Sequence, residues 1–144
     1  MKKSMLILVA VVLAASLGFA AVASAEEVEG TGTLEAHGDG LAALHGTGWM
    51  RVSGNGVLWV KGAENVNIEG QGHKKVFPDG WTEYVGFHGV ARIGGRDMSV
   101  ILAGEEIDLY AIGSGRAILW GEGRYRINKL ITGTWSGAIE VLSY

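Results

Sequence analysis

Apolar and polar residues alternate along the chain from Gly30 to Gly62. Between the glycines every even position is apolar, whereas most odd positions are polar. Successive side chains of an extended strand point to opposite faces, so a two-residue period predicts β-strand with one apolar face. The even apolar positions are Leu34, Ala36, Ala42, Leu44, Met50, Val52, Leu58 and Val60.

Glycine recurs every eight residues in the same stretch. It stands at positions 30, 38, 46, 54 and 62, and the first four open a Gly-x-Gly pair. A glycine within a strand lowers stability by about 0.5–1 kcal/mol relative to alanine. A series of this length without a structural role would therefore destabilise the fold considerably. We therefore predict sharp backbone bends, or backbone approaches too close for a Cβ. The predicted bends are Gly32, Gly40, Gly48 and Gly56, with Gly115 and Gly123 in an echo of the interval.

The parity of the apolar positions changes in the second half of the chain. Phe77–Gly80, with the only proline, reads as a turn. The apolar set is then odd to Gly95, even from Met98 to Gly104, and odd again from Ile107. Because a two-residue hairpin switches parity, the changes at residues 95–97 and 105–106 predict two hairpins and antiparallel neighbours.

These patterns predict an all-β fold that is mainly antiparallel. The first expectation is a strongly coiled small barrel or sandwich in which each Gly-x-Gly is a bend. The alternative is a β-solenoid with sixteen residues per flattened rung, in which residues 34 and 36 face residues 42 and 44. The two predicted hairpins favour the barrel or sandwich.

Residues 1–25 have the features of a secretory signal peptide. Lys2 and Lys3 precede an apolar run, and Ala23-Ser24-Ala25 is a small-x-small cleavage site. The apolar run is also long enough for an uncleaved anchor helix. We predict cleavage and a single glycine-rich β domain over residues 26–144, secreted or located in the cell envelope. The chain has no cysteine, which excludes disulfides and a lipid-modified N-terminal cysteine.

The exported chain is mildly acidic. Loss of Lys2 and Lys3 leaves ten basic residues against fifteen acidic ones, and the basic residues form no run. Nucleic acids and anionic membranes attract basic patches. We therefore expect no nucleic-acid partner and no membrane association once the signal peptide is removed.

No motif for catalysis or cofactor binding is present. The Gly-x-Gly pairs lack the third glycine of a dinucleotide fingerprint and open no predicted helix. No nucleophile elbow or zinc-protease helix occurs, so we expect a non-enzymatic protein without a cofactor. His37 and His45 are weak metal candidates, provided that the eight-residue units stack, and the plainer interpretation is two solvated surface histidines.

Three tryptophans, Trp49, Trp59 and Trp120, are out of phase with their neighbouring apolar positions. They should project from the face opposite the core, where an aromatic patch is typical of a partner or ligand surface. The alternative is that their strands are buried on both faces, which also produces continuous apolar runs. Trp135 is in phase and is expected in the core.

The Gly-x-Gly interval, the segment Gly80-Trp81-Thr82-Glu83-Tyr84-Val85-Gly86-Phe87 and the Gly113–Gly123 echo together carry a resemblance. Over residues 30–127 the chain resembles a group of small secreted glycine-rich β proteins of prokaryotes, including methanogenic archaea. That group has no established activity to transfer. A weaker likeness, to adhesin-head β-solenoids and bactofilin-type polymers, implies the solenoid alternative.

The sequence thus favours an exported β domain that acts by contact, through self-association, envelope structure or an unknown protein or glycan partner. One alternative is a binding module for a small ligand or carbohydrate. Another is a small outer-membrane β-barrel, for which the glycine- and alanine-rich apolar face is poor lipid-facing material.

Overall fold

The computed structural model describes residues 32–144, and these residues form strands and no helix. The strands are β1 (Gly32–Lys61), β2 (Asn65–Val76), β3 (Thr82–Ile127), β4 (Ile131–Ser136) and β5 (Glu140–Ser143). All pairings are antiparallel and belong to one open sheet, which confirms the prediction of an all-β, mainly antiparallel fold. The predicted signal peptide lies outside the described residues. Within residues 32–144, no helix of a length and apolarity suited to crossing a membrane is found.

Most of the molecule is a single long hairpin. β1 and β2 follow one another along β3, from the pair Leu34–Ile127 at one end to Val76–Thr82 at the other. The tip is a tight turn in which Gly80 N donates to Phe77 O at 3.1 Å and Phe77 N donates to Trp81 O at 2.8 Å. The turn predicted at Phe77–Gly80 is therefore confirmed.

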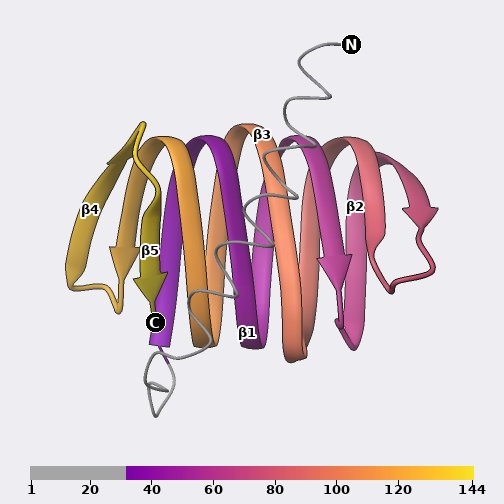
Figure 1. Ribbon diagram of the computed structural model, residues 1–144, viewed down its shortest axis with the longest axis horizontal. Coiled ribbons are helices and arrows are strands. Elements are labelled where there is room, and N and C mark those ends of the chain that lie inside the picture. Colours follow the sequence, from indigo (N-terminus) through magenta and orange to yellow (C-terminus); the bar gives the residue numbers. More distant parts are fainter. Residues whose placement is uncertain (1–31) are drawn as a thin grey trace.

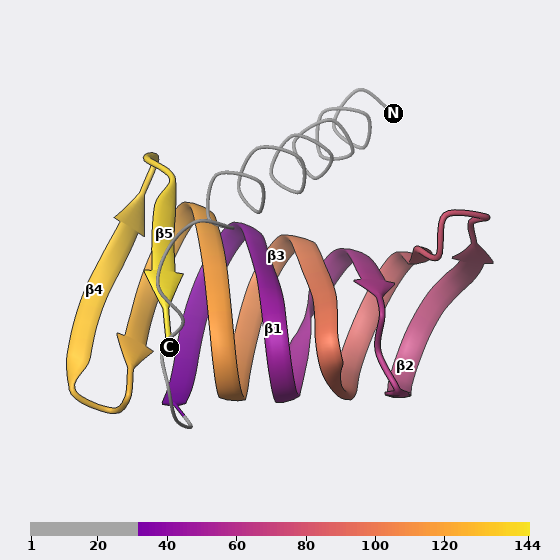
Figure 2. The ribbon, with the colours of Figure 1, turned by 60° about the horizontal axis from the view of Figure 1, so that its bottom comes forward.

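This hairpin is wound into a coil (Figures 1 and 2). Leu34 pairs with both Ala111 and Ile127, which are sixteen residues apart on β3, and Leu109 pairs with both Ala36 and Val52. Each turn of β1 consequently lies between two successive turns of β3. The two strands alternate along the coil axis, and the eight-residue glycine interval corresponds to half a turn.

The two hairpins predicted in the second half are wrong, because β3 continues without a break through both positions. Gly46 and Gly48 pair with Met98 and Gly95, so the single residue Thr47 on β1 opposes Arg96 and Asp97 on β3. The same insertion occurs at 105–106, and both Asp97 and Glu106 have φ of 54°. A β-bulge inserts one residue and therefore reverses parity as a hairpin would. The antiparallel pairing comes instead from the one long hairpin.

The interior of the coil is the core. All eight even apolar positions of β1 point inward and are 0–4 % exposed. The apolar side chains of β3 pack against them from odd positions before the first bulge, from even positions between the bulges and from odd positions after the second. Each bulge shifts the alternation by one residue, so the apolar side chains stay on the inside. Trp135 of β4 is 1 % exposed, which confirms its expected place in the core.

The chain ends by doubling back on β3. After a turn at Asn128 and Lys129, whose φ angles are 51° and 60°, β4 and then β5 pair with the last turn of β3. Tyr144 extends that pairing, because its N donates to Gly115 O at 3.1 Å and its O accepts from Gly115 N at 3.2 Å. β4 and β5 thus form one end of the coil, and β2 forms the other (Figure 1).

Glycines from neighbouring turns meet at the bends. At all six predicted bends an added Cβ would come closer than 3.0 Å to other atoms of the chain. At Gly40 it would run into the carbonyl oxygen of Trp120 and lie 2.8 Å from the Cα of Gly121. The φ of Gly40 is also +128°, which L-residues rarely adopt. Both reasons proposed from the sequence therefore apply at this bend.

We predict that Gly40→Val and Gly48→Val each lower the free energy of unfolding by more than about 1 kcal/mol, because a side chain would force neighbouring turns apart. Urea denaturation measures the effect. Gly94→Val is the control, since its Cβ would be 3.6 Å from Gly48 O and 3.7 Å from Trp49 Cδ1, ordinary contact distances. Equal stability of all three variants would show that the bends tolerate side chains.

Candidate functional site

The coil presents two outer faces. Outward side chains fall on opposite sides because the glycine bends divide each sixteen-residue turn in half. We call one side the apolar face, formed by the outward residues of segments 41–45, 57–61, 99–103 and 116–120. We call the other the polar face, formed by those of segments 33–37, 49–53, 108–112 and 124–126. Residues of each face from successive turns stand side by side in rows.

The centre of the apolar face consists of two rows of side chains. One row contains Leu41, Val57, Ala103 and Trp120, and the next contains Ala43, Trp59, Ile101 and Ile118. Trp59 stacks on Phe77 with ring centroids 5.5 Å apart and meets Trp81 edge-on at 6.3 Å. The turn at the hairpin tip therefore covers one end of this face, whereas Trp120 is 44 % exposed.

Charged residues of opposite sign border these two rows. On one side a basic margin runs through Lys61, His45 and Arg116, with Ser99 between the first two. His45 also contacts Asp97 through Nε2 at 2.9 Å and Ser99 through Nδ1 at 2.8 Å. On the other side an acidic margin runs through Glu105, Asp39 and Glu122. The acidic margin thus carries negative charge throughout, whereas the basic margin also contains the carboxylate of Asp97 beside His45.

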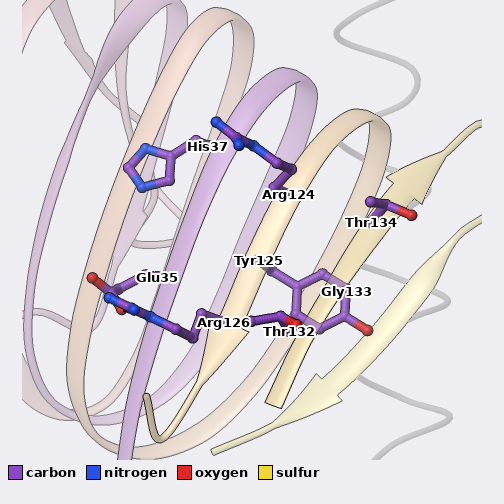
Figure 3. Close-up of a pocket in the computed structure, with 8 residues that line it drawn as sticks. All are labelled: Glu35, His37, Arg124, Tyr125, Arg126, Thr132, Gly133 and Thr134. Carbon is purple, nitrogen blue, oxygen red and sulfur yellow. The ribbon is translucent and has the colours of Figure 1, made fainter. Parts of the chain in front are cut away.

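The polar face contains two shallow hollows of about 370 and 360 Å³ that share Glu35 and His37. Arg124, Arg126, Thr132 and Thr134 are among the residues that line the first (Figure 3). Trp49, Arg51, Asp108 and Tyr110 are among those that line the second. In Figure 3 Arg124 lies beside His37, and Arg126 reaches toward Glu35. Three aromatic side chains, Trp49, Tyr110 and Tyr125, therefore line these hollows together with several hydrogen-bonding groups.

Two ion pairs organise the polar face. Arg126 Nε donates to Glu35 Oε2 at 2.6 Å, and His37 Nδ1 lies 3.4 Å from Asp108 Oδ1. The hydrogen bond from Arg126 is the main reason that the pKa of Glu35 is lowered, and the positive charge of Arg126 adds to the effect. The same hydrogen bond raises the pKa of Arg126.

The structure separates the two weak metal candidates. Turns stack at sixteen residues rather than eight, so His37 lies on the polar face and His45 on the basic margin of the apolar face. Each histidine contacts a different aspartate. In the described part of the chain, no three His, Cys, Asp or Glu residues are grouped as metal ligands would be.

The three tryptophans project outward as predicted, but the structure divides them between the faces. Trp49 pairs with Gly94 and Ile112 on the polar face and is 42 % exposed. Trp59 and Trp120 belong to the apolar face. The sequence interpretation missed the polar-face group around Glu35 and Arg126. Its signal is the sixteen-residue period, which places Glu35 and Arg51 on either side of Tyr110.

No family model, curated protein or solved structure matches this chain. The two faces are therefore interpreted from their own chemistry. An apolar face is suited to packing against another apolar surface. A polar face with exposed aromatic rings is suited to hydrogen bonding and stacking with a polar ligand.

We predict that Arg126→Gln raises the pKa of Glu35 toward its ordinary value, as measured by NMR titration. A lowered folded-state pKa means that the pair stabilises the fold above the unfolded-state pKa, and that this contribution is lost as pH falls through the folded-state pKa. The variant should hence be less stable near neutral pH and equal to the parent in acid. The difference should be small, because both side chains are partly exposed.

Arg124→Gln is the control for this titration. Arg124 lines the same hollow but does not contribute to the lowered pKa of Glu35. Equal displacement of the Glu35 pKa in both variants would contradict the assignment to the Arg126 hydrogen bond.

Proposed function

We propose that this chain is an exported, non-enzymatic β domain of the cell envelope or its surroundings, whose role is contact through the apolar face. The apolar face is the observation that carries the proposal. Apolar side chains on the outer side of a sheet require a second layer, and Trp120 is still 44 % exposed among them, as the apolar residues of interaction sites are. The non-enzymatic part of the proposal is based on the sequence, which contains no catalytic motif.

We also propose that the coil is a β-solenoid variant rather than a barrel or sandwich. Three features support this description: the sixteen-residue turn, the stacking of equivalent residues in rows, and the open sheet with β2 and β4–β5 at its ends. In solenoids, stacked turns create extended surfaces along the axis. Such a scaffold holds outward side chains in fixed rows, which is a suitable arrangement for a contact surface.

Carbohydrate binding on the polar face is the second candidate function. The two joined hollows favour it, because Trp49 and Tyr110 offer ring surfaces beside Arg51, Asp108 and His37. Aromatic rings suit the apolar faces of sugars, and charged groups suit their hydroxyls. This function uses the face opposite to the one that carries the main proposal, so the two can be tested separately.

The matched exposed tryptophans provide that test. We predict that Trp120→Ser abolishes or shrinks the complex that contains the protein in gently extracted envelopes, as measured by native size, because it removes the exposed aromatic ring of the apolar face. Trp49→Ser should leave the complex intact. Thermal unfolding of both variants controls for damage to the fold.

The opposite pattern would contradict contact through the apolar face. If Trp49→Ser alone lost the complex, or lost binding to polysaccharides in a fluorescence screen, the polar face would be the functional one. If neither substitution changed the size of the complex, the exposed tryptophans would not be part of a contact surface.

A further inference from the structure

We propose that β2 joins two copies of this chain end to end. Its free edge would pair antiparallel with the same edge of a second copy, about a two-fold axis perpendicular to the coil axis. This contact lies at one end of the coil rather than on either outer face, so it goes beyond the proposed contact function. Three observations carry it: a long exposed edge, a core that is incomplete beneath that edge, and a sequence in β2 that is complementary to itself.

The two ends of the coil differ in the strands that close them (Figures 1 and 2). At one end β4 and β5, of six and four residues, pair with different segments of β3. At the other end β2 is one strand of twelve residues, and within residues 32–144 it pairs with β3 along one edge only. A long open edge presents backbone N–H and C=O groups to which another strand can add, whereas short edge strands limit such addition.

The core is incomplete beneath the free edge of β2. Val66 points inward beside the buried Ile93 of β3, yet it is 42 % exposed. Val76, in the same inward phase at the other end of β2, is 65 % exposed. Met50 stands one turn before Val66, between two turns of β3, and is 1 % exposed. A further turn against β2 would therefore bury the two valines as the inner turns bury Met50.

Two constraints select a single register for the paired copies. The inside of one coil must continue into the inside of the other, so inward residues must face inward residues. The bends must also coincide, because a straight segment cannot follow a corner at the spacing of paired strands. The bend at Gly70 and Gly72 then lies against its own copy, with Gln71 at the two-fold axis. The bends at Gly62 and Gly80 coincide as well, since both glycines are nine residues from Gln71.

Gly72 supports this placement of the bends. Among the Gly-x-Gly bends of residues 32–144 it is the one glycine that the chain itself does not require. It has no positive φ, and the atom nearest to an added Cβ would be Tyr84 Cβ at 3.5 Å. Where bends 38–40 and 121–123 face each other, an added Cβ at any of the four glycines would come closer than 3.0 Å to the backbone of the neighbouring turn. In the paired copies Gly72 faces Gly70, so a glycine is expected there.

In this register the residues of β2 face partners of matching kind. Apolar side chains meet on the inside, and hydrogen-bond acceptors face donors on the outside. The facing pairs are Val66 with Val76, Glu69 with His73 and Asn67 with Lys75, and each occurs twice by symmetry. Cross-strand pairs of these kinds stabilise antiparallel sheets.

Two charged residues of β2 have further neighbours in the paired copies. Glu69 lies 3.3 Å from Arg92 of its own chain, and its side chain is 66 % exposed, so its carboxylate can also accept from the second copy. Lys74 is the one charged residue in an inward phase on β2. It faces Ile68, along which its alkyl stem can lie while its ammonium group stays in solvent.

Cross-linking tests the register, because the chain has no cysteine of its own. Residues directly opposite on antiparallel strands have Cα atoms about 4.5–5.5 Å apart, a distance that a disulfide spans. Gln71→Cys, in the full chain expressed with its own N-terminal segment, should therefore form a disulfide-linked dimer in an oxidising glutathione buffer, as measured by non-reducing electrophoresis and intact mass.

Glu69→Cys is the matched control for this cross-link. Its two copies would be about 13 Å apart, so alone it should link at least about tenfold more slowly than Gln71→Cys. An equimolar mixture of Glu69→Cys and His73→Cys should link as a heterodimer. Failure of Gln71→Cys to link, or equal linking of Gln71→Cys and Glu69→Cys, would overturn the inference.

Sedimentation velocity of the parent chain tests the dimer itself. It should show a monomer–dimer equilibrium, and Val66→Asp should weaken dimerisation by at least about tenfold, because a charge at the edge opposes strand addition. Val141→Asp is the matched control and should dimerise as the parent does, since Val141 is an exposed valine of β5, at the other end of the coil. Thermal unfolding of each variant shows whether its fold is intact.

Other modes of association give different results, and each would overturn the inference. A chain that stays monomeric at every concentration would mean that the edge of β2 does not pair with itself. A dimer weakened by Val141→Asp but not by Val66→Asp would mean association through the β4–β5 end. A dimer lost in Trp120→Ser but kept in Val66→Asp would mean association through the apolar face, and would leave the proposed contact function standing.

Discussion

The structure depends on the pairing of β1 with β3 along both of its edges. A residue such as Leu34 or Met50 has a β3 neighbour on each side, so successive turns of the hairpin are tied together by the backbone. Paired strands lie about 4.8 Å apart, and this spacing leaves no room for side chains where the chain bends sharply. The coil can therefore form only if the residues at the bends are glycines. Gly40 satisfies this requirement by approaching Gly121 on the next turn.

The bends also explain why the outside of the coil has two distinct faces. Outward residues between one pair of bends are exposed to a different side from those between the next pair. The two outer faces can therefore differ in residue type. Leu41 and Ala43 continue an apolar surface across the turns, whereas Glu35 and His37, half a turn earlier, belong to a charged one. A sheet with a single outer surface would have mixed these residues.

Bulges keep the apolar side chains of β3 on the inside of the coil. β3 covers about three turns of the coil, and a single inserted residue at each bulge changes which side chains point inward. At Glu106 the bulge is held by polar contacts, because its N donates to Asp39 Oδ1 at 2.7 Å and its carboxylate accepts from Asn55 at 3.2 Å. The local backbone cost of φ at 54° is offset by these hydrogen bonds.

The sequence by itself determined the strand content, the inward faces of β1 and β3, the turn at Phe77–Gly80 and the positions of the bends. These features are local, because they depend on alternation, on proline and glycine, and on intervals along the chain. The sequence did not determine the inward face of β5, where Leu142 rather than Val141 is buried. Only the tertiary structure decided that the parity changes at 95–97 and 105–106 are bulges, since a bulge and a hairpin shift the phase equally. It also decided that Trp49 and Trp120 lie on different faces. That division depends on which residues half a turn and a full turn apart become neighbours, and hydrogen bonds between distant segments fix this.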